Sequence, residues 1–238
     1  MYAPKLVYTK MVPETRTQFG VPFTTSVPSP SLLLHFAGAD TSTTFIDSSD
    51  LTHVPIVNGT AQIDNAQSFF GGTSGLFTAS ASSSLRYTDD DGSLAFRTGD
   101  YTVDCLVRFA SVGASAQFWV FSPGAEVITV GKAANDRLAV ACVGVGNLIV
   151  GPTVLVANTW YHVAVTRFNT LTTMFLNGAI EGPPAIDTND YEDSTNGDFY
   201  VGQGSTSFMD GWIDEFRVVK GLAAWTAPFT PPSAPYTP

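Results

Sequence analysis

Positive charge is scarce in this sequence, which has 11 lysines and arginines against 21 aspartates and glutamates and a formal net charge of −10. Proteins that bind nucleic acids use Lys and Arg to neutralise phosphates, so this balance argues against a nucleic-acid partner. No apolar run reaches the roughly 18 residues that a membrane span requires. The N-terminus carries lysines but no apolar stretch ending in small residues, so we expect neither a membrane partner nor export through a standard signal peptide.

Cysteine is also rare, and its two positions exclude several kinds of site. Cys105 and Cys142 lie inside strand-like runs, and the sequence contains neither a C-x-x-C pair nor a zinc-ligand spacing. A disulfide between them is possible in principle, but a disulfide framework needs more cysteines and an oxidising compartment. We therefore expect two small buried apolar side chains.

Long amphipathic helices are missing, and the pattern of strands takes their place. Between Trp160 and Arg167 side chains of different character alternate, which directs them to opposite faces of a pleated strand. A second strand runs from Thr172 to Asn177, after the turn at residues 168–171, and Asn177-Gly178 ends it with a dipeptide that favours positive φ. The pattern predicts a β-hairpin.

The same rhythm recurs along the chain. Residues 101–109 alternate cleanly, with Tyr101, Val103 and Cys105 on one face and Thr102 and Asp104 on the other. Regularly spaced strands without helices predict an all-β fold, an antiparallel β-sandwich of one domain. Further strands are expected at residues 32–36, 53–57, 61–63, 118–121, 127–131, 137–143, 147–155, 199–202 and 211–218, with a two-residue turn at Asn58-Gly59.

Residues 1–31 differ from the rest because prolines at positions 4, 13, 22, 28 and 30 interrupt any sustained periodicity. Proline cannot donate a hydrogen bond to a central strand ladder, so the sequence predicts an extended N-terminal arm. The arm is either a disordered tail or a docking arm that lies on a partner subunit. Residues 32–238 form the expected domain, which ends in a proline-rich tail from Ala227.

Several motifs occur in a fixed order: LLLHFAGAD, TTFIDSS, a Gly-Gly pair, WYHVAVTR, FLNG, FYVG, GWIDEFRVVKG, W-x-x-x-F at residues 225–229 and FTPPSAPY. Together they resemble the laminin-G-like, concanavalin-A-like jelly-roll domains found in many bacteriophage structural proteins. The resemblance covers about residues 32–236. It implies a jelly roll, a fold that carries lectins, glycosidases, adhesion modules and virion parts.

The resemblance also implies a structural calcium ion. In related jelly rolls an Asp at the start of the last strand binds calcium together with main-chain oxygens, and the matching positions are Asp214 and the glycine loop that contains Gly72. Ala37 departs from the pattern, since many relatives have an acidic residue there. The alternative is that Asp214 accepts hydrogen bonds from loop amides. The acidic run at residues 89–91 lacks the distant Glu of an EF-hand and is expected to be a solvated turn.

Catalytic patterns are missing as well. A glycosidase needs two carboxylates on one face, whereas the adjacent Asp214 and Glu215 are expected to point to opposite faces of a strand. Glu126 and Glu181 stand alone beside Gly or Pro, and the sequence has no G-x-S-x-G elbow and no H-E-x-x-H helix. The three histidines at positions 35, 53 and 162 are expected to be structural. The sequence therefore predicts a protein that is not an enzyme.

The resemblance favours a virion structural protein of a bacteriophage, assembled in the host cytoplasm. Because coiled-coil and repeat segments are absent, a capsid decoration or cement protein or a tail-associated protein is expected rather than a fibre shaft. The arm at residues 1–31 would dock on other virion proteins, such as the major capsid or tail proteins, and a homo-oligomeric or particle-bound state is expected.

The alternative is a carbohydrate-binding adhesin or lectin module, at a tail-fibre tip or on a cell surface. Aromatic platforms beside amides and carboxylates suit sugar binding, and the two functions are compatible. A hydrolase would require carboxylates assembled from distant strands. The candidate glycan-binding residues are Trp119, Tyr191, Asn196 and Trp212, with Trp225 as a further aromatic side chain.

Overall fold

The computed structural model describes residues 17–18, 21–22, 29–122, 127–191 and 197–238. Most of the predicted arm lies outside the described residues, although β1 (Thr17–Gln18) and β2 (Val21–Pro22) pair antiparallel with each other. Within the described part no helix is long and apolar enough to cross a membrane. The only helical element there is a single 3-10 turn, η1 (Ala79–Ala81).

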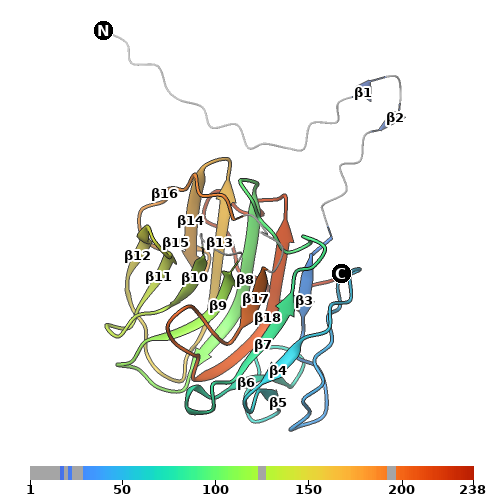
Figure 1. Cartoon of the computed structure of the whole chain (residues 1–238), viewed down its shortest axis with the longest axis vertical. Coiled ribbons are helices and arrows are strands. Elements are labelled where there is room, and N and C mark those ends of the chain that lie inside the picture. Colours follow the sequence, from blue (N-terminus) through green and yellow to red (C-terminus); the bar gives the residue numbers. More distant parts are fainter. Residues whose placement is uncertain (1–16, 19–20, 23–28, 123–126, 192–196) are drawn as a thin grey trace.

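Two antiparallel sheets form a β-sandwich, which confirms the predicted all-β fold (Figure 1). We call the seven-stranded sheet, of order β12-β11-β10-β9-β17-β7-β4, the front sheet. We call the nine-stranded sheet the back sheet; its order is β15-β14-β13-β8-β18-β6-β5, with β3 also paired to β18 and β16 to β14. The two names are labels and do not refer to the viewing direction of Figure 1. The front strands are β4 (Ile56–Asn58), β7 (Ser84–Thr88), β9 (Ala116–Ser122), β10 (Ile128–Lys132), β11 (Arg137–Cys142), β12 (Gly146–Val154) and β17 (Asp198–Val201). The back strands are β3 (Leu32–Leu34), β5 (Gln62–Asp64), β6 (Ser74–Phe77), β8 (Tyr101–Phe109), β13 (Trp160–Phe168), β14 (Leu171–Leu176), β15 (Ala179–Ile180), β16 (Ala185–Ile186) and β18 (Gly211–Lys220).

The predicted hairpin is present as β13 and β14, which pair from Phe168 and Leu171 outward. Asn177 and Gly178 both adopt positive φ, of 50° and 79°, and turn the chain into β15. The alternation predicted for β8 also holds, since its odd-numbered residues enter the core between the sheets. Cys105 and Cys142 are both buried in the core, as expected of small apolar side chains.

Asn58-Gly59 makes the expected turn, but it does not close a hairpin. Gly59 has a φ of 62°, while β4 before it belongs to the front sheet and β5 after it belongs to the back sheet. The turn is therefore a corner at which the chain crosses from one sheet to the other. A dipeptide such as Asn-Gly predicts that the chain turns, but it does not predict which strands the flanking segments pair with.

A β-bulge in β18 overturns the prediction that Asp214 and Glu215 point to opposite faces. The pairing of β18 with β8 shifts register between Asp214 and Arg217, and Glu215 has a φ of 49°. Ile213 and Phe216 are three positions apart in the sequence, yet both enter the core. Because the bulge adds one residue to the strand, both carboxylates between them leave the core side.

The C-terminal tail covers part of the outer face of the back sheet. Tyr236 donates its hydroxyl to the buried Asp104 and its main-chain amide to Glu215 (2.9 Å). Trp225 and Phe229 stack on each other with ring centroids 3.9 Å apart. These residues of the proline-rich tail therefore pack on their own domain.

Beneath the tail lies a group of charges that are buried with their partners. Asp104 accepts from Arg217 (2.9 Å) and lies 3.2 Å from His162 Nε2. Burial alone would raise the pKa of Asp104, but Arg217 and His162 outweigh burial and lower it. The Arg217 guanidinium also lies 3.7 Å from the centre of the Tyr236 ring, so the tail stabilises both ends of the ion pair.

Removing residues 230–238 should destabilise the domain, because the deletion takes away both hydrogen bonds of Tyr236 to charged groups. Such bonds contribute about 1.5–3 kcal/mol each, and we expect the melting temperature to fall by roughly 5 °C or more. Differential scanning calorimetry measures this, with deletion of the exposed Thr237 and Pro238 as the control. A full-length melting temperature in the longer deletion would contradict the role of the tail.

Candidate functional site

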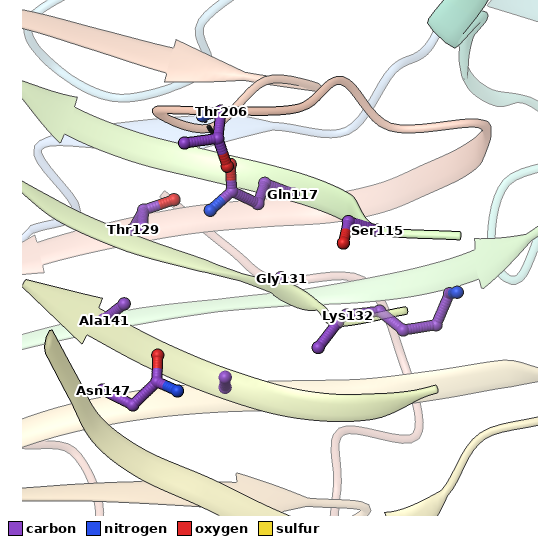
Figure 2. A pocket seen from close by; sticks show the side chains of 10 residues that line it. Ser115, Gln117, Thr129, Gly131, Lys132, Ala141, Asn147 and Thr206 are labelled. Carbon is purple, nitrogen blue, oxygen red and sulfur yellow. Dashed lines mark hydrogen bonds between the residues drawn. The ribbon is translucent and has the colours of Figure 1, made fainter. Parts of the chain in front are cut away.

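A shallow groove of about 130 Å³ lies on the outer face of the front sheet (Figure 2). Its floor consists of small residues on neighbouring strands, Gly131 on β10 and Ala139 and Ala141 on β11. A side chain at Gly131 would place its Cβ 2.5 Å from Gln117 Cα, so this position requires glycine. The groove exists because neighbouring positions on adjacent strands lack bulk, and the polar residues around it are Ser115, Gln117, Thr129, Asn147 and Thr206.

Gln117 offers a fixed hydrogen-bond donor to this groove. Its Oε1 accepts from the Thr206 amide (2.8 Å), the Thr206 hydroxyl (3.0 Å) and the Ser207 amide (3.0 Å). These donors fix which end of the side-chain amide is oxygen. Figure 2 shows the amide nitrogen turned away from Thr206 toward the sheet. The loop at Thr206 and Ser207 therefore fixes the Gln117 amide with its Nε2 available as a hydrogen-bond donor.

The groove is polar but offers little charge. Lys132 lines it, yet the residue is 1% exposed and its ammonium donates to Asp136 (2.6 Å) and to the Ala114 carbonyl (2.5 Å). An amine held by a carboxylate and a carbonyl is not available to a ligand. A second hollow of about 290 Å³ shares Ser115 with the groove and is lined by both polar and apolar residues, Phe208 among them, so the concave surface continues beyond Ser115.

The structure separates the predicted glycan-binding residues. Trp119 is 1% exposed and stacks on Phe199 inside the core, and Tyr191 is fully buried against Asp187. Neither side chain can meet a ligand, so both predictions are wrong. Asn196 lies outside the described residues. Trp212 is half-buried on the outer face of the back sheet and can still meet a ligand.

Trp225 is half-buried but occupied by its own chain, since Phe229 stacks on it and Arg217 lies 5.4 Å from its ring centre. No pattern in the sequence singled out Gln117, Asn147 or Thr206. The small residues at Gly131, Ala139 and Ala141 could have indicated a groove, because the outward side chains of a strand are usually larger. The sequence alone does not show that these positions lie side by side, since that requires the register of the strands.

Asp214, the proposed calcium ligand, meets the loop that leads to the glycine pair. Its Oδ2 accepts from the amides of Phe69 (2.8 Å) and Phe70 (2.9 Å), and Oδ1 accepts from Glu215 (2.9 Å). The alternative suggested by the sequence, a carboxylate that binds loop amides, is therefore present. Gly72 follows with a φ of 86°, in the left-handed region that glycine tolerates.

Burial raises the pKa of Asp214 to about 6, and the loop amides only partly counter this effect. The carboxylate thus carries a buried negative charge that its hydrogen bonds do not fully compensate. A cation would compensate it, and carboxylate and main-chain oxygens are the ligands that calcium prefers. The described residues contain no group of three or more His, Cys, Asp or Glu suited to a metal. Asp214 is therefore the one carboxylate on which a cation at this place would depend, and its oxygens already accept from three main-chain amides.

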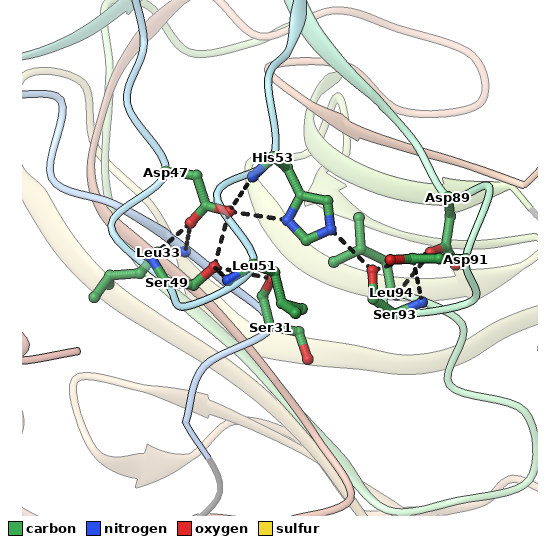
Figure 3. Close-up of polar contacts among 10 residues, drawn as sticks. All are labelled: Ser31, Leu33, Asp47, Ser49, Leu51, His53, Asp89, Asp91, Ser93 and Leu94. Atoms are coloured by element: carbon green, nitrogen blue, oxygen red, sulfur yellow. Dashed lines mark hydrogen bonds and ion pairs between the residues drawn. The ribbon is translucent and has the colours of Figure 1, made fainter.

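The structure also joins Asp47, His53 and Ser93 in a hydrogen-bonded series (Figure 3). Asp47 Oδ2 lies 2.9 Å from His53 Nδ1, and His53 Nε2 lies 2.8 Å from Ser93 Oγ. Asp47 also accepts from the amides of Leu33 and Ser49, both at 2.9 Å. The hydrogen bond to Asp47 raises the pKa of His53 despite partial burial. The order of groups is that of a Ser-His-Asp triad.

The surroundings of Ser93 oppose acyl transfer. The amide of Ser93 donates to Asp91 (2.9 Å) and the amide of Leu94 donates to Asp89 (2.9 Å), so neither N–H is free to stabilise an oxyanion. The Asp89 carboxylate also lies 3.4 Å from Ser93 Oγ and would repel developing negative charge. Asp89 is 1% exposed, so the expectation of a wholly solvated acidic turn is wrong at this residue. The series instead links three loop segments.

One family model matches the chain, and it describes the concanavalin A-like lectin/glucanases superfamily over residues 70–225. The search of curated proteins found no match. Among solved structures, domain 4 of AbnA, a GH43 extracellular arabinanase from Geobacillus stearothermophilus in complex with arabinotriose, is similar with a TM-score of 0.65 and 16% identity. The alignment covers 82% of this chain and 94% of that domain.

The binding domain of botulinum neurotoxin serotype C1 is similar with a TM-score of 0.58 and 15% identity, over 82% of this chain and 49% of that chain. A sialidase of Trypanosoma rangeli matches with a TM-score of 0.57 and 12% identity, over 90% of this chain and 34% of the sialidase. Identities this low establish the fold alone. The family model covers more than half of the sequence, and the chain therefore belongs to the concanavalin A-like lectin/glucanase superfamily.

Proposed function

We propose that this protein is a non-enzymatic carbohydrate-binding domain and that the groove on the front sheet holds the sugar. The observation that carries the proposal is the fixed amide of Gln117 beside a floor of small residues. A groove of about 130 Å³ is smaller than the pockets of roughly 300–1,000 Å³ that enclose drug-sized ligands. It suits one face of a sugar ring, with amide and hydroxyl groups meeting the sugar hydroxyls.

Two further observations support this ligand class. The hollow that adjoins at Ser115 continues the path beyond one ring, which favours an oligosaccharide over a monosaccharide. The arabinanase domain with the same fold was solved with arabinotriose, and the cell entry of botulinum neurotoxin type C, whose structure is also similar, is described as dependent upon interaction with two ganglioside molecules. Carbohydrate recognition is thus compatible with this sandwich, although each ligand belongs to its own protein.

The absence of catalysis is part of the proposal. Asp214 and Glu215 belong to the back sheet, whereas the groove is on the front sheet, so this acidic pair cannot act on a sugar bound there. Asp89 and Asp91 accept hydrogen bonds from the amides of Leu94 and Ser93, so these amides are not available to stabilise an oxyanion beside the Asp47-His53-Ser93 series. These arrangements support binding without turnover.

We further propose that the domain is a structural protein of a bacteriophage virion, either a capsid decoration or cement protein or a tail-associated protein. The ordered motifs of the sequence support this assignment, and its partners would be other virion proteins. The folded domain already includes Ser31, whose amide donates to Val218 (2.7 Å). An arm that precedes Ser31 would therefore start from β3, on the back sheet and away from the groove. An adhesin or lectin outside a virion is the second candidate, and the groove supports both.

We also propose that calcium binds at Asp214, with main-chain oxygens of the glycine loop completing the site. The raised pKa of this carboxyl is the supporting observation, because a nearby cation would stabilise the ionised form. The ion would hold the Phe69-Phe70 segment against β18 and would have a structural role.

Filling the groove should abolish sugar binding without unfolding the domain. Ala141→Phe places a ring on the groove floor, and we expect at least tenfold weaker binding, about 1.4 kcal/mol, of the best oligosaccharide from a glycan array. Isothermal titration calorimetry measures this, with Ile56→Phe on β4 of the same sheet as the control. The wild-type protein should release the oligosaccharide uncleaved. Unchanged affinity in Ala141→Phe would place the sugar elsewhere, and cleavage would show an enzyme.

Deleting residues 1–28 should leave the sandwich folded, because the buried Pro30 and Ser31 are kept. We expect far-ultraviolet circular dichroism and the melting temperature to match those of the full chain, and incorporation into particles or oligomers to be lost. Co-sedimentation with phage particles and analytical ultracentrifugation provide the two measurements. Assembly of the truncated protein at full-length affinity would refute the docking role of the arm.

Calcium removal should change both stability and its pH dependence. A chelator should lower the melting temperature of the wild type but not of Asp214→Asn. Without the ion, folded Asp214 binds a proton near pH 6, whereas the unfolded group does so only near 3.8. The stability of the wild type relative to Asp214→Asn should therefore rise as the pH falls from 7 to 4 in chelator. Identical melting curves with and without chelator would exclude the ion.

A further inference from the structure

Three residues form a row across the outer face of the back sheet. Trp160 on β13 and Trp212 on β18 are the direct cross-strand partners of Arg108 on β8. Direct partners on antiparallel strands project from the same face. The Arg108 guanidinium lies 4.9 Å from the centre of the Trp212 ring. All three side chains are half-buried, so the row is open to solvent on one side.

The Phe69-Phe70 segment borders this row. Phe69 is 45% exposed, and its ring centre lies 6.1 Å from that of Trp160. Asp64 accepts from the indole nitrogen of Trp212 (2.8 Å), which fixes the orientation of that ring. The surface therefore combines rigid aromatic rings with one guanidinium, a combination that is enriched in binding surfaces.

Arg108 differs from the other cationic side chains that the structure describes. No hydrogen-bond acceptor and no carboxylate partner is found for it among the described residues, and its Nη1 is a buried donor without an acceptor. The other described cations all have partners, for example Arg217 with Asp104, Arg86 with Asp198 and Lys132 with Asp136. In a chain of net charge −10, an unpaired arginine is not explained by a shortage of acids.

The contact with the Trp212 ring gives Nη1 no acceptor, and a buried donor without an acceptor destabilises the fold. Neither Asp64, which binds the Trp212 indole, nor Asp214, which binds the Phe69 and Phe70 amides, is bonded to Arg108. Because Arg108 as a whole is half-buried, an external carboxylate can approach its guanidinium from the solvent side, where the two groups pair through parallel hydrogen bonds.

We propose that the row of Trp160, Arg108 and Trp212 binds the carboxylate of an acidic sugar, a uronic or sialic acid, whose ring lies against the aromatic side chains. This inference rests on the proposed carbohydrate-binding function but assigns a second site on the opposite sheet from the groove. The groove has no free cation and suits a neutral glycan. The row suits a glycan that carries a carboxylate.

The test compares sugars that differ only in charge. Trigalacturonate and its methyl ester share their rings, and sialyllactose and its methyl ester form a second pair. Isothermal titration calorimetry should show that the wild type binds at least one acidic sugar at least tenfold more tightly than its neutral counterpart. Raising the salt concentration from 50 to 500 mM should weaken only the acidic member of the pair.

Three variants locate the site. Arg108→Gln should lose at least tenfold in affinity for the acidic sugar. The affinity of Arg108→Lys should lie between those of the wild type and Arg108→Gln, because lysine keeps the charge but lacks the planar guanidinium that makes two parallel hydrogen bonds. Arg86→Gln, on the front sheet, should bind as the wild type does. Circular dichroism should be unchanged in each variant. The melting temperature of the two Arg108 variants should change little, since Arg108 makes no ion pair with the described residues, and Arg86→Gln loses only a solvent-exposed pair with Asp198.

Several outcomes would overturn the proposal: no binding of either acidic sugar, equal binding of acid and neutral partner, or an Arg108→Gln protein with wild-type affinity. Ala141→Phe separates this site from the groove. Acidic-sugar binding that survives in Ala141→Phe but not in Arg108→Gln supports the row, even if neutral oligosaccharides fail to bind and the groove proposal falls. Loss in Ala141→Phe with retention in Arg108→Gln assigns all binding to the groove and rejects the row.

Discussion

The bulge at Glu215 determines how the outer face of the back sheet is covered. It changes the alternation of β18, so that Asp214 and Glu215 both leave the core while Ile213 and Phe216 both remain in it. Asp214 then holds the amides of the Phe69-Phe70 segment, and Glu215 holds the amide of Tyr236. Two adjacent acids thus fix two segments that are far apart in the sequence. In a regular strand one of the two carboxylates would enter the apolar core at a high energetic cost.

Covering one face of the sandwich decides where ligands can bind. The tail and its ion pairs bury Asp104 and His162 on the outer face of the back sheet, so the middle strands there are buried on both sides. The outer face of the front sheet has no comparable cover at its small residues, where the groove lies. On the back sheet the row of Trp160, Arg108 and Trp212 remains half-exposed. The two candidate surfaces are therefore the regions that the chain leaves uncovered.

The fold could be predicted because it depends on local patterns that repeat. Alternation in β8 and β13, positive φ at Asn177 and Gly178, and the order of motifs are all visible in the sequence. Site residues were harder, since a single bulge reverses which side chains face the core. Trp119 shows this on β9, where the register shifts opposite β10 and the consecutive Phe118 and Trp119 are both buried in the core. No sequence period predicts two consecutive inward residues.

The buried acids of this acidic chain are paired with donors. Buried acids each meet specific donors: Asp47 receives amides and His53, Asp104 receives Arg217, and Asp187 receives Thr172 and Tyr191. Their charges are therefore fixed within local networks, in which removing one partner would leave a buried charge uncompensated. Since most described cations are engaged in the same way, little charge is left for recognition. Specificity must then come mainly from amides, hydroxyls and aromatic rings, which matches the groove lining and leaves Arg108 as the described exception.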